Sequence, residues 1–439
     1  TMYPHHLRFI LIFSFVDALH LTHQWLASPR GASILAADTF VDESSGRIIL
    51  ATAGHSDHGS IRLWPLETAR NDIDPSDGVM VKVHGGSIFS LSHLRVVVDG
   101  GGDGDCSPPN EKNRRNTFLV SGSFDRSAAI HRVDVSRGGN NGSAQQFQLE
   151  NIGTLPEHTG WVRGVRAVYR PTDGNDITTE GISVLSIGCN LINVWILLDG
   201  DAPATKPGRE KVRRVARLDA GPSPDDPEVE AFRRHDILSV AVVGDRPGKH
   251  GYIAAGLVDG TLRVFDAHFS EWAGRRLLLY NATGSCDRAT TAITDETPRV
   301  SVRAHDGRVT AVLNMHDSDD FVSVGYDGRW MRWHIGSDGA SLSVVTEGRI
   351  SPPINSGAGG KRICCAAIVR DAGKEGEDRN TLFLGTISGC MYRLCLSKGG
   401  GCDMLWENNE NTASRNCSIT AITHAKVREK IHIYACRSD

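Results

Sequence analysis

Short apolar runs recur along this chain, and a turn separates the two members of each pair of runs. The clearest pair lies at residues 321–333, where FVSVG and RWMRW flank Tyr-Asp-Gly. Alternation of apolar and polar positions with a period of two is typical of β-strands, and an Asp-Gly step supplies a tight turn between antiparallel strands. The pattern therefore predicts a β-hairpin in this stretch.

The same pattern returns at a near-constant interval. Successive turns lie 51 to 69 residues apart, near positions 57, 125, 190, 259, 327, 388 and 439. One supersecondary unit repeated at a regular interval indicates a repeat architecture rather than a series of separate domains. The hairpins are predicted at residues 48–64, 118–131, 183–195, 252–266, 321–333, 381–394 and 430–439.

More strand-like sequence precedes most of these hairpins. A His introduces an apolar stretch, as in HGGSIFSL from His84 and HDGRVTAV from His305, and similar stretches begin at His158 and His235. Another short strand precedes that His, for example at residues 300–303. Each repeat therefore predicts four strands.

Four-stranded repeats with a His near the start and Trp-Asp near the end resemble the WD40 repeat family of β-propellers, and the resemblance covers nearly the whole chain. The fifth repeat matches best. The resemblance implies that its tetrad of hydrogen-bonded side chains is His305, Ser323, Asp327 and Trp333. Other repeats depart from the motif: His131, Phe265 and Leu394 stand at the Trp position, and Pro65 and His334 follow a Trp in place of Asp.

The resemblance implies an all-β fold, a seven-bladed WD40-like β-propeller. The blades are expected at about residues 32–83, 84–157, 158–218, 235–304, 305–347, 361–416 and 417–439. Residues 1–31 form an N-terminal segment whose residues 7–25 would complete the last blade. Pairing of N- and C-terminal strands usually closes rings of this family, and it removes exposed sheet edges.

Both chain ends admit an alternative. The apolar run at residues 9–16 follows Arg8 and has the composition of a short signal-peptide core, although a strand that closes the ring is the favoured interpretation. A chain truncated at Asp439, with an incomplete seventh blade, is the alternative to closure. The apolar run is too short to span a bilayer, which takes about 20 residues.

Composition narrows the class of protein. The 439 residues include 40% hydrophobic and 23% charged residues, which is typical of a globular chain. The formal net charge of −4 argues against a protein that coats nucleic acid or anionic lipid. Ten cysteines without a CxxC pair favour reduced thiols in an intracellular protein of the cytoplasm or nucleus. Long polar stretches, such as residues 99–116 and 398–414, are expected as surface insertions.

No motif in the sequence indicates catalysis, a cofactor or a metal. The chain has no nucleophile elbow and no phosphate-binding loop. His55 and His58 are three residues apart but lack an evident third ligand, and the Gly- and Asp-rich residues 99–105 lack the spacing of an EF-hand. We therefore expect no catalytic residues, no cofactor and no metal site.

The favoured function is a non-catalytic scaffold that binds other proteins, as a monomer within a hetero-complex. Exposed aromatic and Arg side chains on a rigid ring are typical binding hot spots. Those expected beside the His positions and hairpin turns are Phe124, Arg126, Trp161, Arg163, Arg308, Tyr326, Arg329 and Trp330. The two tryptophans have an alternative role as packing between blades.

Two other classes of function stay open. The stretch from His84 to Ser90, with Asp125-Arg126-Ser127-Ala128, resembles WD-repeat partners of tRNA methyltransferases over one blade. This likeness implies an accessory subunit of an RNA-modifying enzyme. A propeller hydrolase with its site at the channel mouth is the less favoured third class.

Overall fold

The computed structural model describes most of the predicted strands. The described residues are 8–16, 20–28, 34–42, 46–55, 58–66, 78–99, 113–136, 146–156, 158–169, 182–197, 212–221, 236–244, 251–269, 271–272, 294–315, 318–351, 361–372, 378–396, 402–406, 418–427 and 430–438.

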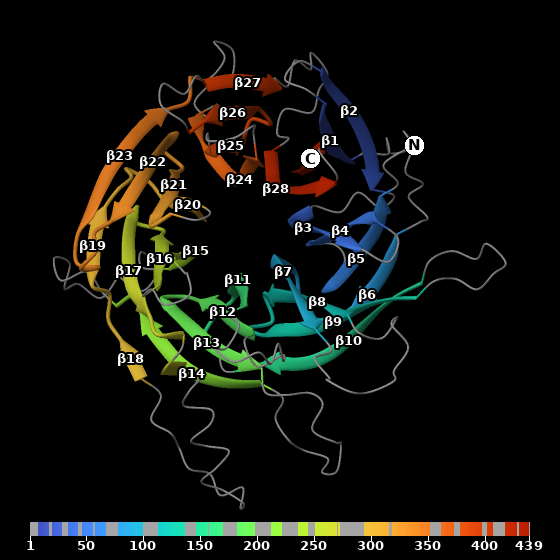
Figure 1. The fold of residues 1–439 in the computed structure, drawn as a ribbon, viewed down its shortest axis with the longest axis horizontal. Coiled ribbons are helices and arrows are strands. Elements are labelled where there is room, and N and C mark those ends of the chain that lie inside the picture. The colour runs from blue at the N-terminus through green and yellow to red at the C-terminus, as the bar shows by residue number, and fades with distance from the viewer. Residues whose placement is uncertain are drawn as a thin grey trace, which may run out of the picture.

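The strands form sheets, antiparallel except at one edge of blade three, that are arranged around a common centre, which makes the molecule an all-β propeller (Figure 1). Six blades are built from consecutive stretches of the chain, apart from one strand of blade three that follows the first three strands of blade four. Blade one contains β3 (Ile34–Asp42), β4 (Arg47–Gly54), β5 (Ser60–Leu66) and β6 (Val79–Lys82). Blade two contains β7 (Ile88–Asp99), β8 (Asn113–Ser123), β9 (Ala128–Ser136) and β10 (Gln146–Leu155).

The middle of the chain forms blades three and four, and one segment of it contributes a strand to each of them. Blade three contains β11 (Val162–Tyr169), β12 (Ile182–Gly188), β13 (Leu191–Leu197), β14 (Val212–Asp219) and β18 (Thr294–Glu296). Blade four contains β15 (Ile237–Val243), β16 (Gly251–Leu257), β17 (Thr261–Ala267) and β19 (Val300–Arg303).

The last two of these six blades have the simple four-stranded order. Blade five contains β20 (Val309–Asn314), β21 (Asp320–Gly325), β22 (Arg329–Ile335) and β23 (Leu342–Arg349). Blade six contains β24 (Ile363–Ala372), β25 (Asp378–Thr386), β26 (Met391–Cys395) and β27 (Cys402–Trp406).

One further sheet combines the two ends of the chain. It runs in the order β2 (His20–Ser28), β1 (Arg8–Val16), β29 (Lys430–Ser438), β28 (Ser418–Val427). The junction is an antiparallel pairing of β1 with β29, in which Phe13 lies opposite Ile433. The predicted turn residue Asp439 lies outside the described residues.

The boundary between the third and fourth blades differs from the prediction. Residues 294–296 were expected in blade four, but β18 pairs in parallel with β14, with Ala216 opposite Thr294. A strand at the outer edge of a sheet leaves backbone N–H and C=O groups available for pairing. The chain uses this edge of blade three before β19 joins blade four.

The hydrophobic core lies between neighbouring sheets. The second strands of blades three, four and five are entirely buried, because a blade of a propeller packs against another blade on each face. One cluster, for example, joins Ile253 and Phe265 of blade four to Val194 of blade three. Another joins Tyr434 of the composite sheet to Trp64 of blade one.

Glycine after the turn Asp brings neighbouring blades into contact. Gly260 follows Asp259 with φ +91°, and a Cβ atom there would lie 2.1 Å from the carbonyl oxygen of His305 in the next blade. Only glycine accepts this conformation together with so close a backbone approach. The Asp-Gly step seen in the sequence is therefore a contact between blades as well as a turn.

Candidate protein-binding face

The four predicted tetrad residues of blade five form one hydrogen-bonded network. His305 Nδ1 lies 3.1 Å from Asp327 Oδ1, and His305 Nε2 lies 2.9 Å from Ser323 Oγ. Trp333 Nε1 donates to the same Ser323 Oγ at 2.8 Å. The network ties the start of the first strand to the second strand, the turn and the third strand.

The directions of these hydrogen bonds follow from the carboxylate. A carboxylate only accepts, so Nδ1 of His305 carries the proton that reaches Asp327. In the neutral imidazole Nε2 is then the acceptor, and the Ser323 hydroxyl donates to it. Burial by itself would raise the pKa of Asp327, but hydrogen bonds from His305 and from two backbone N–H groups outweigh burial and lower it to about 2.

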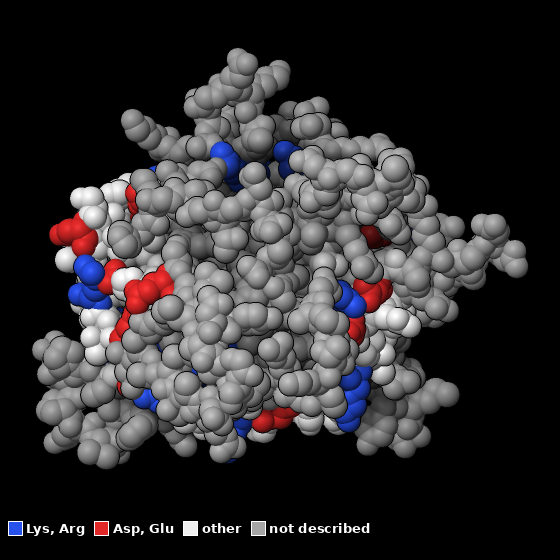
Figure 2. All heavy atoms as spheres, turned by 60° about the horizontal axis from the view of Figure 1, so that its bottom comes forward, with Lys and Arg blue, Asp and Glu red and all other residues white. Residues whose placement is uncertain are grey.

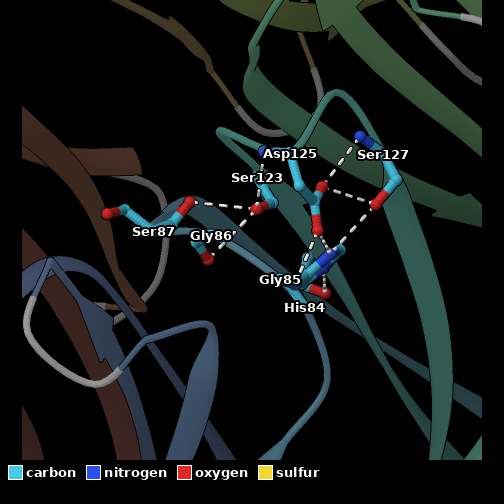
Figure 3. A network of polar contacts seen from close by, with 8 residues as sticks. His84, Gly85, Gly86, Ser87, Ser123, Asp125 and Ser127 are labelled. Carbon is cyan, nitrogen blue, oxygen red and sulfur yellow. Dashed lines mark hydrogen bonds and ion pairs between the residues drawn. The ribbon is translucent and has the colours of Figure 1, made fainter.

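Blade two builds a related network with different residues (Figure 3). His84 Nε2 lies 2.8 Å from Ser121 Oγ, and its Nδ1 lies 3.2 Å from Asp125 and 3.1 Å from Ser127. Asp125 also accepts the backbone N–H of Gly85 at 2.8 Å. The Trp position is taken by a buried His131, and burial is the main reason that its pKa falls to about 4.

These networks decide the type of propeller, because they join the His, the turn Asp and the Ser of the second strand within single blades. The fold is a WD40-type β-propeller. Each blade of this propeller has an end where its first strand begins and its second strand turns into its third. We call this the motif end, and it carries the predicted binding residues.

Comparison with known proteins assigns no function to this chain. No protein-family model matches the chain, and no curated protein matches its sequence. Among solved structures, the β-propeller domain of Cps50 (Swd1) from Myceliophteria thermophila is similar, with a TM-score of 0.47 and 13% sequence identity. The alignment covers 90% of this chain and 95% of that chain.

An exposed aromatic cluster lies at the motif end of blades two and three. It consists of Phe89, Phe124 and Trp161. The ring centroids of Phe124 and Trp161 are 4.5 Å apart, and Phe89 lies 6.3 Å from the first and 6.2 Å from the second. Phe124 is 45% exposed and Trp161 is 41% exposed. Trp161 thus lies on the surface, not between blades.

Two arginines adjoin the aromatic cluster. Arg163 lies over the Trp161 ring, with Cζ 5.3 Å from the ring centroid, and its Nη2 is 3.7 Å from Asp236. Arg126 is exposed in the β8–β9 turn, in a left-handed conformation with φ 68°. The structure therefore brings four of the predicted binding residues, Phe124, Arg126, Trp161 and Arg163, to one place.

A second group of predicted residues lies at the motif end of blades five and six. Arg308 Cζ is 4.7 Å from the centroid of the Tyr326 ring, and Arg362 Cζ is 5.1 Å from it. Arg329, in the same region, forms an ion pair with Glu347. Sequence reasoning missed Arg362 and also Phe89. Arg362 stands directly before the first buried residue of its blade, as Arg308 and Trp161 do in theirs, and this position could have revealed it.

Trp330 is the predicted binding residue that the structure places in the interior. Its side chain is 8% exposed and packs in the core between blades five and six. Gly348 on the adjacent strand makes room for the indole, because a Cβ there would lie 2.6 Å from Trp330 Nε1. This is the packing role that the sequence left open.

The two histidines of the β4–β5 turn that the sequence raised as metal ligands are not joined by a third ligand among the described residues. His55 Nδ1 is bonded to Ser87 Oγ at 2.8 Å, and within the described ranges no three His, Cys, Asp or Glu side chains gather around a possible metal position. The Gly- and Asp-rich residues 100–105 lie outside those ranges. No helix among the described residues is long and apolar enough to cross a membrane.

Charge on the described surface is mixed in sign. On the face shown in Figure 2, the coloured Lys and Arg side chains of the described residues lie among coloured Asp and Glu side chains.

Proposed function

We propose that this propeller is a non-catalytic scaffold that binds other proteins through its motif end within a hetero-complex. The observation that carries the proposal is the exposed aromatic cluster flanked by Arg126 and Arg163. Trp, Tyr and Arg dominate the binding energy of protein interfaces, and such residues act best when they are grouped. Three aromatic rings in mutual contact at the surface fit this role.

The cluster is also held in a fixed position. Phe124 donates its backbone N–H to the carbonyl of Ser87 at 2.8 Å, and the network of His84 and Asp125 fixes the same turn. Rigid contact groups lose little conformational entropy on binding. The fixed position of the three rings therefore favours a role in binding a partner over a role in packing between blades.

Quantitative affinity capture from native cell extract, followed by mass spectrometry, tests the proposal. The wild-type chain should retain a stoichiometric protein partner at low and high salt. The double variant Phe124→Ala/Trp161→Ala should lose at least nine-tenths of the captured partner. A tenfold loss of affinity corresponds to roughly 1.4 kcal/mol of binding free energy. The matched control is Val345→Ala/Met404→Ala, which removes equally exposed apolar side chains from outer strands.

The outcomes separate the classes of function. Equal capture by both double variants would contradict the aromatic cluster as the binding site. Recovery of tRNA or a methyltransferase would favour an accessory subunit of an RNA-modifying enzyme instead. In blade two, however, His84, Asp125 and Ser127 all take part in the polar network that holds the blade. This structural role already explains why these residues, which carry the resemblance to partners of tRNA methyltransferases, are present. Absence of any partner would redirect the search to hydrolase activity.

The proposal places the protein inside the cell, in the cytoplasm or the nucleus. Six cysteines in the described part of the chain are free thiols: Cys189, Cys364, Cys365, Cys390, Cys402 and Cys436. Burial raises the pKa of the Cys436 thiol to about 12, which suits a reduced structural cysteine. Fractionation of cells that express the tagged full-length chain would test this location.

We further propose that the composite sheet closes the ring as its seventh blade. Support comes from the innermost strands, since β28 contacts both β24 of blade six and β3 of blade one. Thr39 Oγ1 lies 3.1 Å from Thr423 Oγ1 across the second of these contacts. The chain ends would then hold neighbouring blades together.

Deletion of residues 1–31 tests closure. It removes β1 and β2 and leaves β29 with an unpaired edge, so we expect aggregation in size-exclusion chromatography or a fall in Tm of more than about 10 °C. A control deletion takes residues 102–110 from a predicted insertion. A deleted chain that stays monomeric with an unchanged Tm would favour the signal-peptide interpretation.

A further inference from the structure

We propose that Arg308, Tyr326 and Arg362 bind an anionic side chain of a protein partner, a carboxylate or a phosphoryl group carried by an extended peptide. This inference rests on the proposed scaffold function, and it adds the chemistry of the partner. The site lies at the same motif end as the aromatic cluster, but on blades five and six.

The site is formed by two blades. Arg308 directly precedes β20 of blade five, Arg362 directly precedes β24 of blade six, and Tyr326 lies in the turn between β21 and β22. The backbone fixes the ring, because the N–H of Tyr326 donates to the carbonyl of Arg308 at 2.9 Å. Both guanidinium groups are within 6 Å of the ring centroid, the range of a cation–π contact.

The two cations lack a carboxylate partner. Within the described residues neither Arg308 nor Arg362 forms an ion pair, whereas Arg329 in the same blade as Arg308 and Arg163 in blade three are each paired with an acid. Both Arg308 and Arg362 are exposed. Two like charges against one ring repel each other, and an anion placed between them would relieve that repulsion while accepting hydrogen bonds from both forks.

The acidic residues beside the site do not fill this role. Asp327 is committed to His305 and to the backbone N–H groups of Asp306 and Arg329. The Asp306 side chain is exposed, and within the described residues it forms no ion pair with either arginine. Arg308 and Arg362 therefore keep their charge-assisted donors available for a ligand.

The geometry favours a peptide over single-stranded nucleic acid. Recognition of unpaired nucleotides uses free faces of aromatic rings, on which bases stack. Guanidinium groups already lie over the Tyr326 ring. An anionic peptide needs only the forks of the two arginines, which stay available beside the ring.

Fluorescence anisotropy with defined probes tests the inference on the full-length chain. The probes are a labelled peptide of alternating Glu and Gly, the same peptide with phosphoserine for Glu, the same peptide with Gln for Glu, and a uridine oligonucleotide of matched length. The variants are Arg308→Gln and Arg362→Gln. The control Arg393→Gln removes the same charge from β26, where Arg393 is paired with Asp403.

We expect the Glu or the phosphoserine peptide to bind, with whichever binds more tightly identifying the anionic group. Each Arg-to-Gln variant should raise Kd about tenfold, as expected for loss of a hydrogen bond between charged groups. Arg308→Lys should lose less affinity for the peptide than Arg308→Gln because it keeps the charge. The control Arg393→Gln should change Kd less than twofold. A matching Tm for all variants would show that they are folded.

Three results would overturn the inference. They are equal binding of the Gln peptide, unchanged Kd in both Arg-to-Gln variants, and tighter binding of the oligonucleotide with loss in the same variants. Capture of a protein partner that Arg308→Gln and Arg362→Gln retain in full would refute this inference alone. Failure of the wild-type chain to capture any protein would refute the scaffold function itself.

Discussion

Blade three and blade five share three side chains of the motif network and differ in the fourth. In blade three, His158 Nε2 lies 2.7 Å from Ser186 Oγ, and Trp195 Nε1 donates to the same oxygen at 2.8 Å. Blade five repeats these contacts with its own His, Ser and Trp. Its turn adds Asp327, whereas the turn of blade three has Asn190.

The substitution changes the environment of the imidazole. Asn190 points to Asp219, to which its Nδ2 donates at 2.8 Å, and no side chain of the described residues bonds to His158 Nδ1. Burial lowers the pKa of His158 to about 4, and backbone groups of Arg126 and Leu155 oppose this only in part. The comparison teaches that His, Ser and Trp hold the blade, while the turn carboxylate adds a hydrogen-bond partner for the second imidazole nitrogen.

The largest expected effect comes from removing the shared Ser. Ser323→Ala and Ser186→Ala should each destabilise the protein by about 2–4 kcal/mol, because each leaves a buried imidazole nitrogen and an indole N–H without a partner. Thermal unfolding of both variants measures the loss, with the exposed Ser343→Ala in blade five as control. A much smaller loss in blade three would show that its network is not equivalent.

A change of pH should separate the two blades next. The folded pKa of His158 is below its unfolded value, so the unfolded chain binds more protons and stability falls as the pH drops from about 6.5 towards 4, by on the order of 2–3 kcal/mol. Asp327 has the depressed pKa of a stabilised carboxylate, so its contribution is present above about 3.8 and disappears as the pH falls through about 2.

The variant His158→Asn checks this assignment. It should reduce the difference in Tm between pH 7.5 and pH 5, although part of the difference will persist because His131 also has a pKa lowered to about 4. Ser343→Ala in blade five removes an exposed side chain that does not titrate, and as the control it should leave that difference unchanged. An undiminished difference in His158→Asn would rule out His158 as a source of the pH dependence.

The smallest effect is expected from giving blade three the missing acid. Asn190→Asp should destabilise the protein by about 1 kcal/mol, because the new carboxylate would face Asp219 instead of donating to it. The turn is also shorter, since Gly188 pairs directly with Leu191. A rise in Tm, with a raised His158 pKa seen by NMR, would show that the full tetrad can form there.

Much of this architecture could be predicted from residue patterns. Alternating runs around Asp-Gly located the hairpins, and the tetrad of blade five lies where the resemblance implied. The pattern could not reveal that Thr294–Glu296 would join β14, because three polar residues carry no periodic signal and parallel pairing depends on a free edge elsewhere. It also could not show that Trp161 is exposed whereas Trp330 is buried.

The binding face shows the same limit. Phe124 and Trp161 could be proposed individually from their positions beside turns, but their contact with Phe89 depends on how blade two lies against blade three. Arg362 was missed because its significance comes from Tyr326 of the preceding blade. A contact between two repeats produces no recognisable pattern in the sequence of either repeat alone.

The sequence by itself determined the repeat, the hairpins and the polar residues that stabilise each blade, because these depend on local periodicity and turn chemistry. The tertiary structure decided which side chains are exposed, which arginines are paired and which residues of different blades share a site. The physical reason is that strand alternation is a property of neighbouring residues. Exposure and charge pairing are instead set by the packing of sheets whose strands are distant in the chain.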